Sequence, residues 1–374
     1  MNKSINNIKI AIIHDWLNTF TGAEKVLEQI VHLFPNADLF TVVDFLGAKK
    51  ILNINKVKTS FIQHIPFARK YYRQYLPLMP YAVGKFNLSD YDLILSSSHA
   101  VAKGVKTHER QLHICYIHTP IRYAWDLRTQ YLLEANYKGL KKILANYILD
   151  KIRVWDYNNS SGVDYFISNS KYIRSRVKRC YGRDSHVIYP PVDIDSFKLT
   201  EKKEDYFLTA SRFVPYKKVN LIVEAFTKIP NKRLLVIGDG PDAEKIKKIA
   251  GNNVIFKGFL EQNKLIEYMQ NAKAFIFAAE EDFGIMPVEV QACGTPVIAY
   301  GKGGALETVI NGQTGLLFSE QTIESLVDAI DRLELQYTQF DPQIIRQNAE
   351  RFSIEIFRKK YFNFVKTNHE RSYN

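Results

Sequence analysis

Short apolar runs recur along the chain, each followed by a stretch of helical periodicity, and this alternation constrains the fold more than any other feature. The runs lie at residues 8–13, 37–42, 93–95, 113–117 and 165–167, and again at 206–210, 233–237, 254–257, 274–278, 296–299 and 315–318. Strands that alternate with helices form parallel sheets, because each crossover helix returns the chain to the same edge of the sheet. The pattern predicts an α/β protein built from doubly wound domains.

Two adjacent prolines divide this pattern. Pro190 and Pro191 cannot continue a helix or a central strand, and residues 198–205 after them are mostly polar or charged. A chain of 374 residues has the length of two domains, and we expect a ligand in the cleft between their strand ends. The expected divisions are a Rossmann-like domain at 1–187, a linker at 188–204, a second Rossmann-like domain at 205–341, and a helical segment at 342–374 that packs back on the first domain.

Charge is divided unevenly between the two halves of the chain. Residues 1–190 hold 27 Lys and Arg against 14 Asp and Glu, a formal charge of +13, whereas residues 191–374 carry −1. Such a basic half suits nucleic acid, an anionic membrane surface or a phosphorylated ligand. No recognised nucleic-acid motif accompanies the charge, so we expect no nucleic-acid partner. Residues 67–80 mix cations with aromatic side chains, as segments in lipid headgroups do; a packed helix with a solvated face is the alternative.

The cysteines and the N-terminal residues indicate the compartment. Cys115, Cys180 and Cys293 form no CxxC pair, which argues against a disulfide framework and against a thiolate zinc site. The first apolar run is too short for a secretion signal, and no stretch of 18 apolar residues is present. We expect a cytoplasmic protein without a membrane-spanning helix.

In the second half, cations and glycines stand where strands meet helices. Arg212 and Lys217 flank the turn after residues 206–210, and two cations at a strand end suit a diphosphate; a solvated basic turn is the alternative. Gly238 belongs to a Gly-Asp-Gly turn that lacks the Gly-Lys-Ser/Thr of a phosphate-binding loop, and a plain tight turn is its simpler interpretation.

An acidic stretch follows the strand expected at 274–278 and holds the densest cluster of candidate residues. Glu281 is expected on the loop, and Glu289 in the first turns of the next helix, facing the same cleft. Carboxylates there can accept hydrogen bonds from sugar and ribose hydroxyls, whereas an acidic loop with a helix charge that favours the dipole is the alternative. Main-chain N–H groups that can hold a phosphate come from Gly284, Ile285 and Met286.

Several segments stand in one order and spacing along nearly the whole chain. They are Tyr-Pro-Pro-Val-Asp at 189–193, Arg212 with Lys217, Gly-Asp-Gly at 238–240, Glu281 with Glu289, Gly-Thr-Pro-Val-Ile at 294–298 and Gly-Gly-Ala-Leu-Glu at 303–307. Together they resemble glycosyltransferase family 4, whose members have the GT-B fold of two Rossmann-like domains with a nucleotide sugar between them.

Three further segments resemble one branch of that family, which includes mannosyltransferases of O-antigen and capsule assembly. They are YDLILSSSHAVAKGV at 91–105, HTPIRYAWD at 118–126 and Glu-Asp-Phe-Gly at 281–284. One departure lies near the N-terminus, where Thr21-Gly22 stands in place of the more usual Gly-Gly. Gly22 opens the first expected helix and is the candidate for a phosphate contact in the N-terminal domain.

The resemblance implies a retaining glycosyltransferase that needs no metal ion or other cofactor. In such enzymes Arg212 and Lys217 stabilise the charge on the departing diphosphate, Glu281 holds hydroxyls of the donor sugar, and Glu289 accepts from the ribose. His118 lines the acceptor side near the donor sugar; a buried structural histidine is the alternative. The sequence agrees on the metal, since it has no DxD motif at a strand end and its histidines lack ligand spacing. The remaining donor contacts are expected from Gly22, Gly238, Phe283, Gly284, Ile285 and Met286.

The resemblance also indicates the substrates. We expect the N-terminal domain to bind the acceptor and the C-terminal domain to bind a nucleotide sugar, with GDP-mannose as the first candidate. The expected acceptor is a glycan or a polyprenyl-diphosphate-linked glycan of cell-surface polysaccharide or lipopolysaccharide, met at the inner face of the cytoplasmic membrane. A UDP-sugar donor, and a sugar-nucleotide epimerase of the same fold, are the alternatives.

Overall fold

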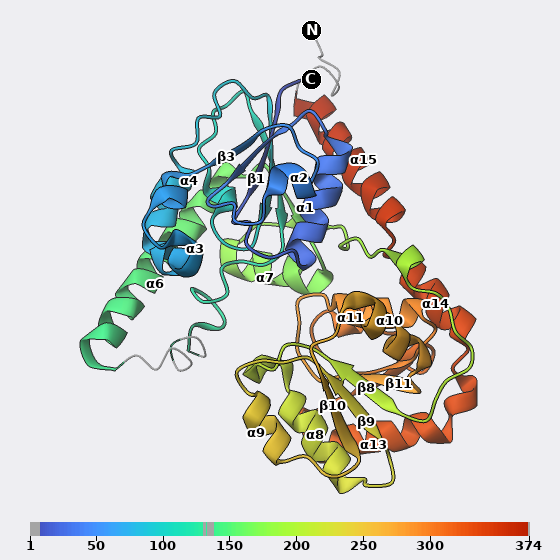
Figure 1. Ribbon diagram of the computed structural model, residues 1–374. Coiled ribbons are helices and arrows are strands. Elements are labelled where there is room, and N and C mark those ends of the chain that lie inside the picture. The colour runs from blue at the N-terminus through green and yellow to red at the C-terminus, as the bar shows by residue number, and fades with distance from the viewer. Residues whose placement is uncertain (1–7, 130–131, 133–137, 373–374) are drawn as a thin grey trace. The chain divides into compact units, whose positions relative to one another are not determined.

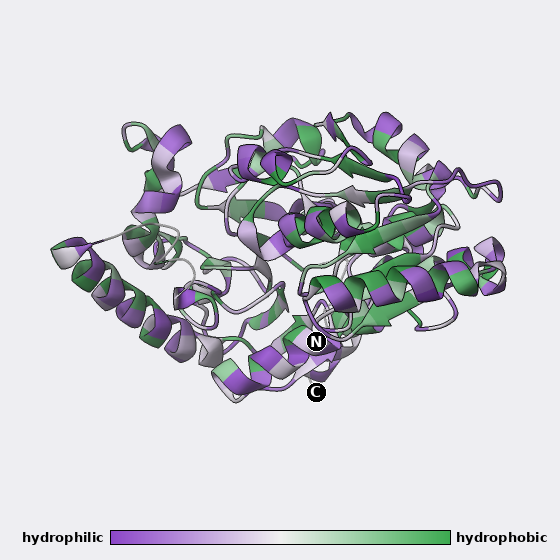
Figure 2. Ribbon diagram, turned by 90° about the horizontal axis from the view of Figure 1, so that it is seen from below, coloured by the Kyte–Doolittle hydropathy of each residue, from purple (hydrophilic) through white to green (hydrophobic). Residues whose placement is uncertain are grey.

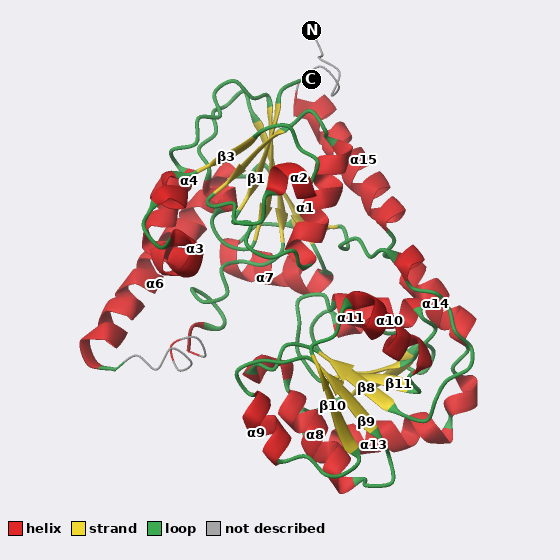
Figure 3. Ribbon diagram, viewed as in Figure 1, coloured by secondary structure: helices red, strands yellow, loops and turns green. Residues whose placement is uncertain are grey.

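The computed structural model describes residues 8–129, 132 and 138–372, and the chain divides into two units. Unit 1 comprises the chain up to Pro191 together with the part from Phe357, and unit 2 comprises Val192–Ile356. In each unit, helices flank a parallel sheet (Figure 3). The predicted fold class, with two doubly wound α/β domains, is confirmed.

The sheet of unit 1 is built from short parallel strands. They are β1 (Ile10–His14), β2 (Asp38–Thr41), β3 (Val57–Thr59), β4 (Leu93–Ser98), β5 (Leu112–Ile117), β6 (Tyr165–Ser168) and β7 (Ser185–Val187). Their order in the sheet is β3-β2-β1-β4-β5-β6-β7, so the first strand of the chain lies in the interior (Figure 1). Every residue of β1, β4 and β5 is buried, as expected for parallel strands that are covered on both faces.

Helices cover the two faces of this sheet with separate apolar clusters. They are α1 (Gly22–Leu33), α2 (Ala48–Ile51), α3 (Ala68–Tyr71), α4 (Met79–Val83), α6 (Gly139–Asn159), α7 (Lys171–Tyr181) and α15 (Ile354–Ser372). Ile12 packs with Val26 of α1 and Phe357 of α15, whereas its neighbour Ile13 packs with Met79 on the other face. Successive side chains of a strand point to opposite faces, so β1 contributes to both clusters.

Unit 2 repeats this plan. Its strands are β8 (Phe207–Ala210), β9 (Leu234–Ile237), β10 (Val254–Gly258), β11 (Ala274–Phe277), β12 (Val297–Tyr300) and β13 (Gly315–Phe318), in the order β10-β9-β8-β11-β12-β13. Its helices are α8 (Val219–Lys228), α9 (Ala243–Lys248), α10 (Gln262–Asn271), α11 (Ile285–Ala292), α12 (Ala305–Thr308), α13 (Ile323–Leu335) and α14 (Pro342–Glu350). Figure 2 shows the hydrophobic strands between more polar helices.

The chain around residue 192 and after residue 342 packs differently from the expected divisions. Val192 N–H donates to Phe352 O at 2.9 Å, and the Arg346 side chain donates to main-chain carbonyls of Phe197 and Ala292 at 2.5 Å. These bonds hold residues 192–197, predicted as part of a linker, within unit 2. The predicted segment 342–374 is shared, because α14 packs on α11 in unit 2 while α15 enters the core of unit 1.

In both sheets the strand order reverses beside the first strand of the unit. In unit 1 this place lies between β1 and β4, and in unit 2 between β8 and β11. The loops at the carboxyl ends of such strands diverge, which leaves room for a ligand. The loops after these four strands are therefore where site residues are sought. Among the described residues, no helix is both long and apolar enough to cross a membrane.

Candidate active site

In unit 2 the loops after β8 and β11 bring together two of the predicted residues. Lys217 donates a hydrogen bond through Nζ to the Glu281 carboxylate. Each side chain keeps 20% of its surface exposed, so a ligand can reach the pair. Because β8 and β11 are neighbours in the sheet, opposite charges from two loops meet where a parallel sheet of this order binds ligands.

Arg212 lies in the same turn as Lys217 and is exposed. The turn after β9 fixes it, since Phe213 N–H donates to Asp239 O at 2.9 Å and Ser211 N–H donates to Ile237 O at 3.1 Å. Gly238 has φ 127°, and a Cβ there would lie 1.9 Å from Ser211 O. Only glycine allows this approach, so Gly238 packs against the turn that carries Arg212; its donor contact stays a prediction.

The loop that carries Glu281 rests on a glycine. Gly304 N–H donates to Glu281 O at 2.8 Å, and a Cβ on Gly304 would lie 2.3 Å from main-chain atoms of Phe283. Phe283 is 3% exposed, and its ring packs edge-on against Phe352 with centroids 5.4 Å apart. The Phe283 side chain therefore belongs to the interior of unit 2. Only the main chain of Phe283 is left to make the predicted donor contact, which stays a prediction.

The start of α11 offers main-chain N–H groups. Gly284 caps the helix with φ 81°, and the first N–H groups of a helix have no partner within it. Ile285 and Met286 are half-buried there, whereas Pro287 has no N–H to contribute. Glu289 lies one turn further along α11 and is also half-buried. These positions fit the predicted phosphate and ribose contacts, which stay predictions.

In unit 1, His118 directly follows β5. Its Nε2 lies 2.9 Å from Ser97 Oγ, and its main-chain N–H donates to Ser98 O at 2.9 Å. Burial, with the nearby His99 and His14, lowers the pKa of His118 to about 3. The ring is therefore neutral at physiological pH. With one N–H and one bare nitrogen, it can meet hydroxyl groups but supplies no positive charge.

A buried polar cluster surrounds His118, and the sequence interpretation missed it. Asp15 accepts hydrogen bonds from the main-chain N–H groups of residues 99–102 at 2.6–3.0 Å, and His99 Nδ1 lies 3.0 Å from its carboxylate. Burial raises the pKa of Asp15, but His99, His14 and these N–H groups outweigh burial, so the pKa is lowered from its ordinary value. The signal was present, because His14-Asp15 and the polar run after residue 95 both end apolar strands.

Gly22 is the first residue of α1 and is half-buried. The turn before it is held by Glu24, whose Oε2 accepts from Thr21 N–H at 2.9 Å and from Thr21 Oγ1–H at 2.7 Å. This capping arrangement fixes the start of the helix beside the end of β1. The phosphate contact of Gly22 stays a prediction.

The segment after His118 is tied to α7 by a buried arginine. Arg176 donates to Thr119 Oγ1 at 3.0 Å and pairs with Asp126 at 2.8 Å. Arg179 pairs with the same Asp126 oxygen at 2.7 Å. Both ends of the segment 119–126, which carries the family-like motif, are thus fixed to one helix.

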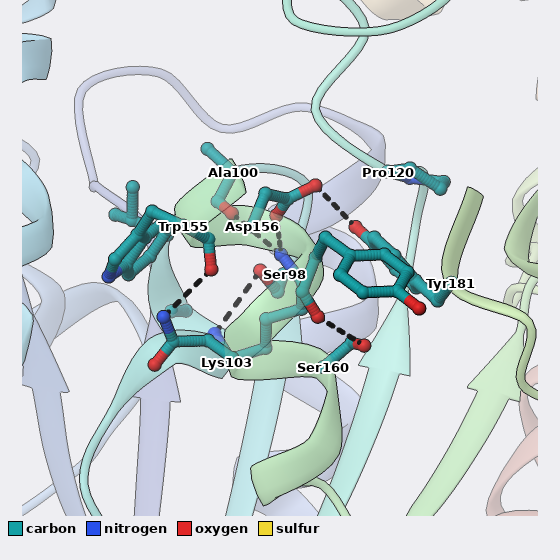
Figure 4. A network of polar contacts seen from close by, with 12 residues as sticks. Ser98, Ala100, Lys103, Pro120, Trp155, Asp156, Ser160 and Tyr181 are labelled. Atoms are coloured by element: carbon teal, nitrogen blue, oxygen red, sulfur yellow. Dashed lines mark hydrogen bonds and ion pairs between the residues drawn. The ribbon is translucent and has the colours of Figure 1, made fainter. Parts of the chain in front are cut away.

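Figure 4 shows a second tie, which centres on Asp156 of α6. Asp156 pairs with Lys103 and accepts hydrogen bonds from Tyr181 Oη at 2.7 Å and from Trp125 Nε1 at 2.8 Å. The side chains of Lys103 and Asp156 are 1% and 0% exposed, so this ion pair is fully desolvated. Through Trp125 it anchors the segment after His118 to α6.

The predicted site residues divide between the units: His118 and Gly22 belong to unit 1, and the others belong to unit 2. In the part of the chain that the structure describes, no group of three His, Cys, Asp or Glu side chains is placed to hold a metal ion.

Two family models match the sequence in adjacent stretches. One, described as Glycosyltransferase Family 4, matches residues 20–196, and the other, described as Glycosyl transferases group 1, matches residues 192–352.

Two curated mannosyltransferases illustrate the relatives. A GDP-mannose-dependent alpha-(1-6)-phosphatidylinositol monomannoside mannosyltransferase of Mycobacterium tuberculosis is 30% identical over 203 residues, which are 46% of this chain and 53% of that protein. An alpha-1,3/1,6-mannosyltransferase of Candida glabrata is 24% identical over 260 residues, with 53% and 56% covered. The chain thus spans about half the length of the curated relatives it matches.

Solved structures resemble the chain over nearly its full length. HepE of Anabaena, in complex with UDP and glucose, has a TM-score of 0.69 at 20% identity and covers 96% of this chain and 99% of its own. Sucrose-phosphate synthase from Thermosynechococcus elongatus has a TM-score of 0.73 at 17% identity, with the same coverage. At these identities the likeness shows the fold alone, and the predicted GT-B fold is confirmed. Since the two family models together cover residues 20–352, the chain belongs to glycosyltransferase family 4.

Proposed function

We propose that the protein is a retaining glycosyltransferase that moves mannose from GDP-mannose to a glycan or lipid-linked glycan acceptor in the synthesis of cell-surface polysaccharide. The observation that carries this proposal is the Lys217–Glu281 pair at the carboxyl ends of β8 and β11. GDP-mannose is favoured because the name of the Mycobacterium relative carries it. HepE was solved with UDP, so a UDP-sugar is the alternative donor.

The reaction breaks the bond between C1 of the donor sugar and the diphosphate oxygen, and the electron pair leaves with the nucleoside diphosphate. The acceptor hydroxyl oxygen forms the new bond to C1 on the same face of the sugar, and its proton passes to the departing diphosphate oxygen. Negative charge therefore grows on the diphosphate, where Arg212 and Lys217 stabilise it. Glu281 holds Lys217 and accepts from hydroxyls of the sugar, and Glu289 accepts from the ribose.

Donor binding tests this proposal without knowledge of the acceptor. A ligand at 100 times its Kd stabilises the folded protein by about 2.7 kcal/mol, so GDP-mannose is expected to raise the thermal midpoint of unfolding. GDP-glucose, UDP-glucose and free mannose serve as controls in the same scan. A larger shift with UDP-glucose than with GDP-mannose would identify a UDP-sugar as the donor. No shift with any nucleotide sugar, or release of an epimerised sugar nucleotide without acceptor, would overturn the transferase.

We also propose that transfer needs no metal ion, because side-chain cations at the end of β8 take the position of a metal beside the diphosphate. Treatment with EDTA is therefore expected to leave the rate of transfer unchanged, and added Mg²⁺ or Mn²⁺ to give no gain. The measurement is product formation from radiolabelled donor. Loss of activity with EDTA that either cation restores would contradict this proposal.

An anionic membrane surface is the partner that we propose for unit 1, at the inner face of the cytoplasmic membrane. One side of α6 packs inward through Ile152, which is 3% exposed, while apolar residues on the other side are exposed to solvent. The outward side chains are 57–83% exposed and lie at helical spacing on one side of α6: Leu140, Ile143, Leu144, Tyr147 and Val154. A helix that is apolar on two sides is ordinarily covered on both.

The charges on and near α6 favour an anionic membrane over a second copy of the chain as the partner of this outer side. Lys141, Lys142, Lys151 and Arg153 lie on the helix and are exposed, and like charges oppose pairing with a second copy of the same helix. Residues 67–80 add exposed Phe67, which is 75% exposed, and three exposed cations. Near an anionic bilayer each cation contributes about 1 kcal/mol, and the apolar side chains enter the headgroup region.

Vesicle co-sedimentation checks this surface. Binding is expected to require anionic lipid and to fall as salt rises, because salt screens the cations. Changing Leu140, Ile143, Leu144 and Tyr147 together to Ser is expected to abolish it, and changing Arg69, Lys70 and Arg73 to Ser is expected to weaken it. The matched control changes Phe259 and Leu335 of unit 2, which are 83% and 88% exposed, and should bind as wild type. Equal binding to neutral vesicles, or none to anionic vesicles at low salt, refutes the membrane partner.

A further inference from the structure

A chain of buried polar groups leads from α1 to His118 in unit 1. Glu24 Oε1 lies 3.6 Å from His14 Nε2, His14 Nδ1 lies 3.2 Å from Ser97 Oγ, and Ser97 Oγ lies 2.9 Å from His118 Nε2. The side chains of His14 and Glu24 are 0% and 5% exposed, and Ser97 is fully buried. These groups therefore interact with one another instead of with bulk water.

The charge of Glu24 determines which ring nitrogen of His14 carries the hydrogen. Burial raises the pKa of Glu24, but His14 and Thr21 outweigh it and lower the pKa to about 2. Glu24 is therefore ionised and can only accept. A carboxylate favours a hydrogen on the imidazole nitrogen that faces it, which here is Nε2 of His14. In a neutral imidazole with its hydrogen on Nε2, the lone pair lies on Nδ1.

The hydrogen position on His14 determines the hydrogen position on His118, because Ser97 has one O–H and its Oγ contacts a nitrogen of each ring. Ser97 donates to the lone pair of His14 Nδ1, and its oxygen is then left to accept from His118 Nε2–H. His118 is neutral, since burial lowers its pKa to about 3, so it carries no second hydrogen. Its Nδ1 is left with a lone pair.

Neighbouring rings fix the plane of the His118 imidazole. The ring of Tyr116 lies edge-on with its centroid 5.2 Å away, and that of His99 lies edge-on at 6.3 Å. Ring orientation and tautomer are thus set by different contacts, and both are held before a ligand arrives.

We propose that Glu24, His14 and Ser97 are positioning residues that hold His118 in the tautomer with its hydrogen on Nε2, so that Nδ1 accepts a hydrogen bond from a sugar hydroxyl. The identity of that hydroxyl rests on the proposed transferase function, whereas the tautomer does not. His118 thereby distinguishes a hydroxyl, which can donate to Nδ1, from a group that can only accept.

The alternative to this proposal is that the two hydrogen bonds of Ser97 run in the opposite direction. If both nitrogens of His14 carried hydrogen, Ser97 would accept from His14 and donate to His118 Nε2. His118 would then carry its hydrogen on Nδ1 and would present a donor to the ligand. The two directions use the same heavy-atom positions, so the experiment must locate the hydrogens.

Long-range ¹H–¹⁵N correlation spectra of the ¹⁵N-labelled full chain locate them, with His118 assigned from its loss in His118→Gln. Wild type is expected to show a neutral His118 with its hydrogen on Nε2. Ser97→Ala is expected to abolish the single tautomer and give a mixture. Glu24→Gln, which keeps the shape but removes the charge, is expected to give a mixture as well and serves if Ser97→Ala does not fold.

Ser96→Ala is the matched control, since Ser96 is the preceding residue of β4 and its Oγ lies 2.8 Å from His113 Nε2 in a buried pair. It should cost similar stability yet leave the His118 signals unchanged. Hydrogen on Nδ1 in wild type, a doubly protonated His118, or an unchanged tautomer in Ser97→Ala and Glu24→Gln each overturns the proposal.

Kinetics connect the tautomer to the reaction. Ser97→Ala is expected to lower kcat/KM about tenfold, the free energy of one hydrogen bond, while Ser96→Ala stays near wild type. If the spectra agree and kcat/KM does not fall, the positioning of a substrate hydroxyl is overturned. If the spectra agree but no nucleotide sugar binds or reacts, the proposed function fails while the tautomer assignment stands.

Discussion

Lys217→Ala is expected to lower kcat by about 10²–10³-fold, the loss seen when one group that stabilises transition-state charge is removed. Lys217 and Glu281 form an ion pair at the ends of β8 and β11, so the substitution removes the cation and also leaves Glu281 without it. The donor is bound before charge develops on the diphosphate, so KM should change less than kcat. Steady-state kinetics with GDP-mannose measure both constants.

Lys228→Ala is the control for this substitution. Lys228 is exposed in the last turn of α8, the helix that Lys217 precedes, and its loss should leave kcat unchanged. Arg212→Lys should also lower kcat, because lysine cannot reproduce the planar two-pronged contact of arginine with a phosphate. If Lys217→Ala retains near-wild-type kcat, the two cations form only a basic turn.

Asp156→Ala is expected to destabilise the protein by about 3–5 kcal/mol, because it leaves the Lys103 ammonium buried without a counter-charge. The substitution also removes the acceptor of the Trp125 and Tyr181 hydrogen bonds. Urea unfolding followed by circular dichroism measures the change. The double substitution Lys103→Met with Asp156→Leu should recover much of the loss, since replacing both charges removes the unpaired ion.

Lys264→Ala is the control for the substitutions at the buried Lys103–Asp156 pair. Lys264 forms an exposed ion pair with Glu267 on α10, and pairs of that kind contribute little to stability. Its unfolding curve should overlay that of wild type. If Asp156→Ala unfolds at the same urea concentration as Lys264→Ala, the network in Figure 4 does not stabilise unit 1.

The fold was predictable wherever a strand is buried on both faces. Residues 93–95 and 274–278 are apolar runs, and they become β4 and β11, whose residues are all buried. The edge strands β3 and β7 were not predicted, because each has three residues and β3 is only half-buried. Three residues are too few to show an apolar pattern, whereas the longer edge strands β10 and β13 were predicted.

The charged pair of unit 2 was predictable to a greater extent than the polar cluster of unit 1. Both Lys217 and Glu281 follow strong apolar runs, and the family resemblance assigned both to the binding of one donor, although it did not predict their ion pair. The link between His14 and Ser97 spans 83 residues and depends on β4 pairing with β1, not with β3. Strand order is set by the packing of the whole sheet, and the local sequence around His14 does not record it.

The passage of α15 into the core of unit 1 has a consequence for biosynthesis. Phe357, Tyr361 and Val365 cover the face of β1 that also packs on α1, yet the ribosome adds them only after all of unit 2. Until they emerge, the first sheet has one apolar face incompletely covered, while residues 192–356 already form a complete unit. The sheet of unit 1 can therefore be fully covered only after the whole of unit 2 has been made, and until then its apolar face is open to aggregation.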